Sequence, residues 1–228
     1  MKMVLHVILI SLFSLTIISC AKKSNSSSSD TTDTTVESCT TTTTGTTTQM
    51  GGSRQGVELC LSTVVTTLAG TGSSGSANGT GTSASFYSPS GITTDGTNLY
   101  VVDYGNHLIR KIIISTGAVT TLAGTGSSGS ADNSTGTSAS FNQPYGITTD
   151  GTNLYVTDYS NHLIRKIVIS TGAVTTLAGT GSSGSANGTG TSASFSGPYG
   201  ITTDGTNLYV AELAVNPGGE TNLIRQIE

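Results

Sequence analysis

Residues 91–101 read Gly-Ile-Thr-Thr-Asp-Gly-Thr-Asn-Leu-Tyr-Val, and the same letters return at 146–156 and at 200–210. In each copy, Asp-Gly separates two runs rich in Thr, Ile, Leu, Tyr and Val, which is the pattern of two strands joined by a tight turn. A long repeat that contains several short strands is typical of propellers and solenoids. The sequence therefore predicts an all-β repeat array.

Each full repeat reads as four strands. In the first copy we expect strands at 91–94, 98–103, 108–114 and 118–123, joined by turns rich in Gly, Asn and Ser. The predicted repeat boundaries are 91–123, 146–178 and 200–228, and the third copy stops after its third strand. Residues 57–70 resemble the fourth strand of a repeat without its first three, so the repeat domain is expected to cover 57–228.

A connector of about twenty residues precedes each repeat, and a structureless loop of that length is unusual in a compact domain. The connector returns almost unchanged in every copy, which favours one defined conformation. It carries one phenylalanine each time, namely Phe86, Phe141 and Phe195. We expect these rings to pack between repeats, with residues 82–85 forming one helical turn.

The order of motifs resembles the NHL repeat of exported bacterial proteins. The matching elements are Phe-x-x-Pro-x-Gly-Ile, then Asp-Gly-x-Asn-Leu-Tyr-Val, then Asp-Tyr-x-Asn-His-Leu-Ile-Arg-Lys-Ile, then Val-Thr-Thr-Leu-Ala-Gly. The resemblance covers about residues 64–228 and implies β-propeller blades, most often six in a ring, that act mainly as binding platforms. The third copy departs from the pattern at Glu212, Asn222 and Gln226.

Three blades are too few for a closed ring, because propellers use about four to eight. The sequence starts with a fourth strand that lacks its blade and stops with a blade that lacks its fourth strand, so each supplies what the other lacks. We therefore expect a homodimer in which two chains form one six-bladed ring, each lending residues 62–70 to the third blade of the other. An open three-bladed arc and a fragment of a longer gene are the alternatives.

The N-terminus resembles a bacterial lipoprotein signal. Residues 1–19 hold a Lys followed by a short apolar run, and Ile-Ile-Ser precedes Cys20 as in a lipobox. The resemblance implies a lipid on Cys20 and a membrane-anchored protein of the bacterial cell envelope, at the outer membrane, either periplasmic or surface-exposed. Ordinary secretion is the alternative. Residues 20–56 are rich in Ser and Thr and are expected to form a disordered tether.

The composition argues against a nucleic-acid partner. The net charge is −4, and only 10% of residues are charged, so a basic footprint for nucleic acid is missing from the sequence. Cys39 and Cys60 form either a disulfide, which an exported protein would keep, or two free thiols. No Cys or His spacing indicates a metal site, and no cofactor is predicted.

Two groups of residues are candidates for a site. The first recurs with each repeat, and we interpret it as structural polar pairing between strands rather than as acid–base chemistry; it comprises Asp103, His107, Arg110, Asp158, His162, Arg165, Glu212 and Arg225. The second lies where the copies differ, on the face that also carries the expanded loop 213–221. Its members are the candidate ligand-binding residues Tyr145, Tyr199, Asn216 and Glu220.

The functional expectation is a membrane-tethered binding or scaffold module for an unknown protein or glycan. Near-identical blades offer equivalent copies of one surface, whereas a catalytic centre on the propeller axis needs unlike residues from unlike blades. The prediction is therefore a non-enzyme, with an exported propeller enzyme, a lyase or a lactonase-like hydrolase, as the alternative.

Overall fold

The computed structural model describes residues 39–43, 46–50, 53–54, 57–58, 64–213 and 222–228. The chain divides into two compact units, Met1–Thr66 and Thr67–Glu228, which are described separately below. Within the described residues, no helix is long and apolar enough to cross a membrane. The predicted signal sequence, Cys20 and Cys60 lie outside the described residues, as does the side chain of Cys39.

The first unit contains two short antiparallel hairpins. β1 (Cys39–Thr43) pairs with β2 (Thr46–Met50), and β3 (Ser53–Arg54) pairs with β4 (Val57–Glu58). This differs from the expectation of a tether without regular structure over the same residues. The physical reason is the composition of β1 and β2, since threonine is β-branched and has a high preference for strands.

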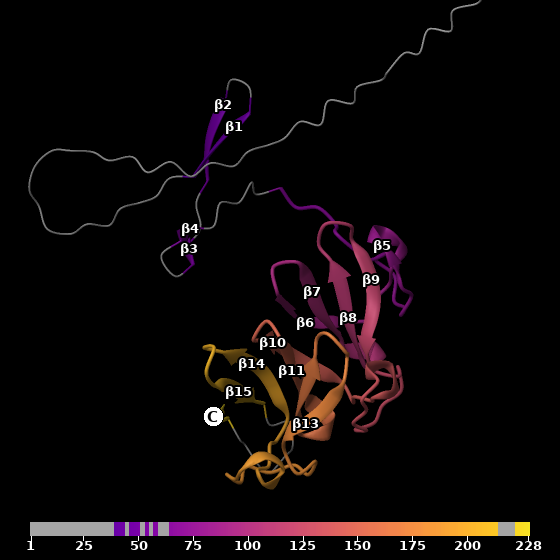
Figure 1. Cartoon of the computed structure of the whole chain (residues 1–228), viewed down its shortest axis with the longest axis vertical. Coiled ribbons are helices and arrows are strands. Elements are labelled where there is room, and N and C mark those ends of the chain that lie inside the picture. The colour runs from indigo at the N-terminus through magenta and orange to yellow at the C-terminus, as the bar shows by residue number, and fades with distance from the viewer. Residues whose placement is uncertain (1–38, 44–45, 51–52, 55–56, 59–63, 214–221) are drawn as a thin grey trace, which may run out of the picture. The chain divides into compact units, whose positions relative to one another are not determined.

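The second unit consists of three antiparallel sheets, which are the blades of a β-propeller (Figure 1). Blade 1 holds β6 (Pro89–Thr94), β7 (Asn98–Asp103), β8 (Leu108–Ile113) and β9 (Ala118–Ala123). Blade 2 holds β10 (Pro144–Thr149), β11 (Asn153–Asp158), β12 (Leu163–Val168) and β13 (Val174–Ala178). Blade 3 holds β14 (Pro198–Thr203), β15 (Leu208–Glu212) and β16 (Ile224–Ile227).

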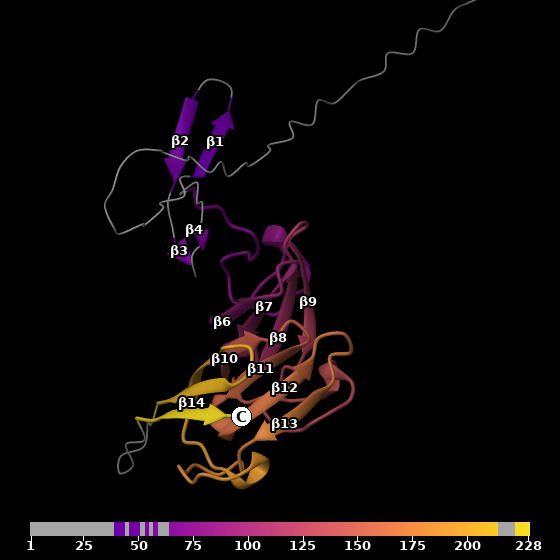
Figure 2. The same ribbon diagram turned by 60° about the vertical axis from the view of Figure 1, so that its left-hand side comes forward.

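The first strands of the three blades lie next to one another, with β10 between β6 and β14 (Figure 2). The close approach depends on a glycine in each strand. A Cβ atom on Gly91 would come within 2.6 Å of the carbonyl oxygen of Tyr145, and one on Gly146 within 2.4 Å of that of Tyr199. Glycine therefore lets neighbouring blades approach each other at their inner strands.

The connectors are ordered and line the outer strands. Each contains one 3₁₀ turn: η1 (Gly81–Ser83), η3 (Gly136–Ser138) or η5 (Gly190–Ser192). This location agrees with the expected helical turn to within a residue or two. In blade 1 the connector also adds a short fifth strand, β5 (Gly79–Thr80), to the outside of β9, which the sequence did not predict.

The hydrophobic core lies between consecutive blades. Phe141 and Phe195 are 0% and 2% exposed, and each packs in a cluster that joins its own blade to the one before. Phe86 is half-buried, because no described blade precedes blade 1. The expectation that these rings pack between repeats therefore holds for the second and third copies.

The outer strand expected over residues 57–70 needs a second chain to pair with, so it stays a prediction. Residues 64–70 form no strand, and β4 pairs with β3 instead. A fourth strand needs a third strand beside it, and residues 64–70 pair with none of the described strands. The outer edge of β16 likewise carries no strand in the described part of the chain.

Candidate functional site

A buried ion pair sits inside every blade. In blade 2, Nη1 of Arg165 donates to Oδ2 of Asp158 at 2.7 Å, and both side chains are 0% exposed. Nη2 of Arg165 also donates to Asp132 at 2.7 Å and to the carbonyl of Ala131. Asp158 in turn accepts the backbone N–H of Asn142 at 2.8 Å. The pair thus ties the connector to the second and third strands.

The same arrangement recurs in the other blades. Arg110 bonds to Asp103 at 2.9 Å and to Asn78 at 2.9 Å. Arg225 bonds to Glu212 at 2.7 Å and to Asn187 at 3.0 Å, so the longer acid of the third copy still reaches its partner. Each guanidinium also lies over the connector phenylalanine, 5.1–5.2 Å from the ring centroid.

These pairs have the features of structural groups. They are buried, and the carboxylate oxygens accept hydrogen bonds from arginine, asparagine and backbone donors. Burial raises the pKa of Asp158 above its usual value. Within residues 64–213 and 222–228, no three His, Cys, Asp or Glu side chains form a group that would hold a metal ion.

The histidines lie apart from the ion pairs and link neighbouring blades. Nδ1 of His107 accepts the backbone N–H of Gln143 at 2.9 Å, and Nδ1 of His162 accepts that of Gly197 at 3.1 Å. Both histidines adopt the left-handed conformation, with φ of 55° and 57°. Burial lowers the pKa of His162, which keeps its ring neutral and able to accept. The Asp, His and Arg residues that were grouped together from the sequence therefore make two separate kinds of contact. Asp and Arg form an ion pair within a blade, and His accepts a hydrogen bond from the next connector.

Four tyrosines from blades 1, 2 and 3 form a ladder of rings. Tyr145 and Tyr199 stack with centroids 3.6 Å apart and an interplanar angle of 26°. Tyr104 meets Tyr145 edge-on at 5.9 Å, and Tyr159 meets Tyr199 edge-on at 6.2 Å. We call this set, Tyr104, Tyr145, Tyr159 and Tyr199, the tyrosine ladder.

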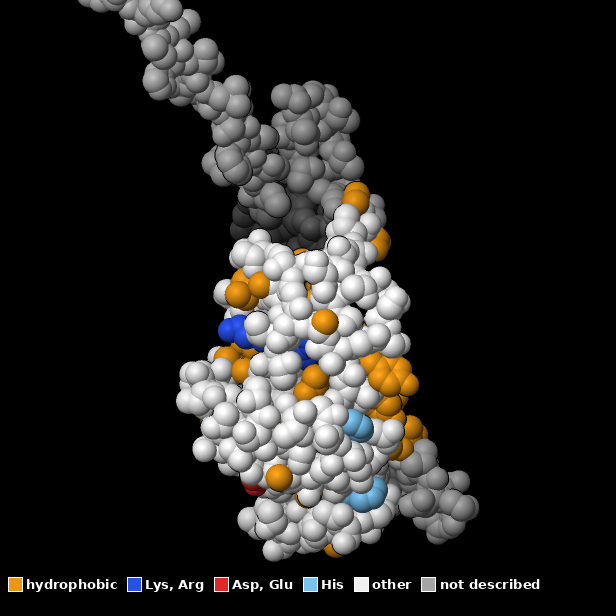
Figure 3. Space-filling model, turned by 90° about the vertical axis from the view of Figure 1, so that its right-hand side faces the viewer, with side chains coloured by type: hydrophobic (Ala, Val, Ile, Leu, Met, Phe, Trp, Pro, Cys, Tyr) orange, Lys and Arg blue, Asp and Glu red, His pale blue; other side chains and the backbone are white. Residues whose placement is uncertain are grey.

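The fold positions the ladder at one end of the inner strands. Tyr145 and Tyr199 are the second residues of β10 and β14, while Tyr104 and Tyr159 begin the 3₁₀ turns η2 (Tyr104–Asn106) and η4 (Tyr159–Asn161). All four rings are half-buried, so part of each residue remains accessible. The face drawn in Figure 3 carries the two described histidines beside a run of hydrophobic side chains, a class that includes tyrosine.

Two tyrosines of the ladder have raised pKa values. The Tyr145 hydroxyl, helped by burial, raises the pKa of Tyr199 to about 12, and burial raises the pKa of Tyr159. These two phenols therefore stay protonated at neutral pH and can donate as well as accept hydrogen bonds. Aromatic faces with neutral hydroxyls at their edges suit a ligand with both apolar and hydroxyl-bearing surfaces.

The sequence identified two rungs of the ladder, Tyr145 and Tyr199, and missed the other two as ligand candidates. Tyr104 and Tyr159 were visible as the residues that follow Asp103 and Asp158, on the same face. Asn216 and Glu220, the other candidates, lie outside the described residues.

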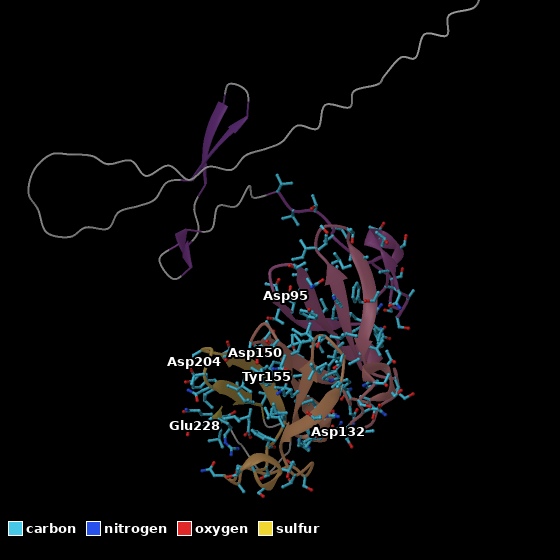
Figure 4. All side chains as sticks on the ribbon, in the orientation of Figure 1. Asp95, Asp132, Asp150, Tyr155, Asp204 and Glu228 are labelled. Carbon is cyan, nitrogen blue, oxygen red and sulfur yellow. The ribbon has the colours of Figure 1, made fainter. Side chains whose placement is uncertain are left out.

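The opposite end of the blades carries the Asp-Gly turns (Figure 4). Asp150 accepts the backbone N–H groups of Thr152 and Asn153 at 2.7 and 2.6 Å and the hydroxyl of Tyr155 at 2.8 Å. Burial opposes ionisation, but these bonds, together with the Asn153 side chain, lower the pKa of Asp150 to about 2. The backbone donors of the matching turn lower the pKa of Asp204 to about 2. These carboxylates stabilise turns.

Comparisons with known proteins agree with the repeat pattern. No family model matches the chain. NHL repeat-containing protein 2 of Homo sapiens is 38% identical over 107 residues, 45% of this chain and 15% of that protein. The Bos taurus protein of the same name is 38% identical over 104 residues, 44% of this chain and 14% of that protein. The chain thus spans a small part of the curated relatives it matches.

Two solved structures resemble part of the chain. A Bacteroides thetaiotaomicron protein of unknown function is 29% identical, with a TM-score of 0.46, and the match covers 50% of this chain and 30% of that one. An auxiliary nutrient binding protein from Bacteroides ovatus is 19% identical, with a TM-score of 0.46, over 77% of this chain and 43% of that one.

Proposed function

Because the chain is an NHL-repeat protein whose repeats fold as β-propeller blades, we propose that it is a binding module whose ligand contacts the tyrosine ladder. The ligand is a glycan or a protein of the bacterial cell envelope. A lipid on Cys20, attached after removal of residues 1–19, anchors the module to the outer membrane.

The observation that carries the proposal is the ladder itself. Its residues come from three blades, and two of its rungs stand at positions where the copies differ, since Ser90 holds the place of Tyr145 and Tyr199. The buried ion pairs recur in all three blades, whereas the stacked pair forms only between blades 2 and 3. Blade 1 folds without a tyrosine at this position, so the stacked pair is not required by every blade. This favours a role for the pair in recognition.

Tyrosine fluorescence offers a direct test, because the chain contains no tryptophan and eight tyrosines. We expect soluble envelope glycans or peptides to change the emission of the full chain on titration. Replacing Tyr145 and Tyr199 by Ala removes a stacked anchor, so the Kd should rise at least about tenfold, as for a typical binding hot spot.

The matched control is Tyr155→Phe, which alters a tyrosine at the opposite end of the blades. It should leave the Kd unchanged. Unaltered binding by the Tyr145→Ala/Tyr199→Ala variant would contradict the proposed site. Catalytic conversion of a glycan by the wild-type chain would favour the enzyme alternative.

The anchor has its own test. Cys20→Ser should shift the protein from the membrane fraction to the soluble fraction and abolish metabolic labelling with a fatty acid. Labelling that persists in Cys20→Ser would contradict the lipid site.

A further inference from the structure

Blade 3 contains an empty groove where the other blades have their fourth strand. The groove has a volume of about 410 Å³ and runs between β16 and the connector. We call it the outer-strand groove, and we define it by Asn187, Gly188, Thr189, Phe195, Arg225 and Gln226. Figure 2 shows β16, the C-terminal yellow strand, at the edge of its sheet.

Blades 1 and 2 show what fits this groove. In blade 1, β9 lies between β8 and β5, with Val119 opposite both Ile112 and Gly79. In blade 2, β13 lies against β12, and Val174 also bridges to Asn133 of the connector. The fourth strand is therefore held on both sides, by the third strand and by the connector.

The chain carries a further copy of this strand that pairs with none of the described strands. Residues 65–69 read Val-Thr-Thr-Leu-Ala, as do residues 119–123 and 174–178. Val65 is 95% exposed, whereas Val119 and Val174 are 2% and 1% exposed. The end of the segment is already placed like its counterparts, because the N–H of Gly70 donates to the carbonyl of Gly81 at 3.1 Å, as Gly124 does to Gly136.

The two outward faces of the array have complementary apolar residues. Ile92 on the leading face of blade 1 is 60% exposed, while its counterpart Ile147, covered by blade 1, is 6% exposed. Ile224 on the trailing face of blade 3 is 75% exposed, and its counterparts Ile109 and Ile164 are 0% exposed. An open apolar hollow of about 310 Å³ lies beside Ile224 on this face.

We propose that a second copy of this chain covers both faces, with its residues 65–69 in the outer-strand groove. The internal blades give the register. By analogy with β8–β9 and β12–β13, Ile224 faces Ala69, Arg225 faces Thr67, Gln226 faces Thr66 and Ile227 faces Val65 of the other chain. The leading face of its blade 1 then packs on the trailing face of blade 3.

Two such junctions close the assembly. Propellers need at least about four blades, so the three described blades cannot meet around an axis by themselves, whereas two copies of them supply six. Each chain gives its strand and receives the other's, which is the reciprocal exchange expected of a twofold dimer. The exchange also leaves neither β16 nor residues 65–69 as an unpaired edge.

The first experiment measures mass. The full chain in mild detergent, analysed by light scattering at micromolar concentration, should give a protein mass twice that of one chain. Ile224→Asp places a charge in the junction and should give a monomer. Ile113→Glu is the matched control, since Glu228 stands at that position in blade 3, and it should remain a dimer. A wild-type monomer, or a species larger than a dimer, would overturn the proposal.

The second experiment tests the register between chains. In full chains with Cys20, Cys39 and Cys60 replaced by Ser, one protein carries Thr66→Cys and the other Gln226→Cys. Residues directly opposite in an antiparallel pair are close enough for a disulfide. Mild oxidation of the mixture should yield a covalent dimer joining the two proteins. Each variant alone should stay mostly uncrosslinked, and an equal yield in the single-variant samples would overturn the register.

Discussion

At the scale of single residues, Arg165 does more than pair with one acid. Its guanidinium joins Asp158, Asp132 and two connector carbonyls while lying on Phe141. Lysine keeps the charge but cannot span these acceptors from a single nitrogen. We expect Arg165→Lys to lower the free energy of unfolding by about 3 kcal/mol, as for a broken buried pair, in urea titrations followed by circular dichroism.

Lys166→Met provides the control for this effect. It alters the next residue of β12, whose side chain is half-buried, and should change the free energy of unfolding by no more than about 0.5 kcal/mol. Equal losses of unfolding free energy in the two variants would mean that the hydrogen bonds of the Arg165 guanidinium are not what stabilises the blade.

The turn aspartates give a prediction for acidic pH. The pKa of Asp150 is about 2 in the folded chain and about 3.9 in an unfolded one. A group with a lowered folded pKa stabilises the protein fully above its unfolded value and loses that contribution as the pH falls toward its folded value. The free energy of unfolding should therefore drop between about pH 4 and pH 2, and Asp150→Asn should reduce this drop. A drop of the same size in both proteins would contradict the assignment.

At the scale of the elements, the repeat pattern predicts the strands well and their side-chain partners poorly. The observed bounds of β6 to β9 lie within two residues of those expected, because alternating apolar residues and Asp-Gly turns are local signals. The partners of Arg110 are not local, since Asn78 and Ala77 lie more than thirty residues away in the connector. Only the packing of the connector against β9 brings them together.

The partners of the histidines are likewise not predictable from local sequence. From the sequence, His162 was grouped with the ion pair of its own blade, but it accepts a backbone N–H from the next connector. Its pKa is lowered by burial, so the link stabilises the fold above about pH 6.5 and is lost as the pH falls below that value. The midpoint of urea unfolding should therefore decrease from pH 7.5 to pH 5.

His162→Asn separates this link from other effects of acid. Asparagine tolerates the left-handed conformation, and Asn222 stands at this position in blade 3. The variant should show a smaller decrease between pH 7.5 and pH 5, because one titrating acceptor is gone. An unchanged decrease would show that the link is not the source of the pH dependence.

At the scale of the whole molecule, stability should depend on concentration if two chains share their outer strands. A dimer that unfolds to separate chains loses about 1.4 kcal/mol per tenfold dilution. For a folded assembly of this size, that corresponds to a fall in Tm of about 2 °C per tenfold dilution. The Tm of Ile224→Asp should instead be the same at every concentration, because its trailing face cannot bind a second chain. A wild-type Tm that does not move over about two decades of protein concentration would mean that residues 65–69 and the outer-strand groove are not joined between chains.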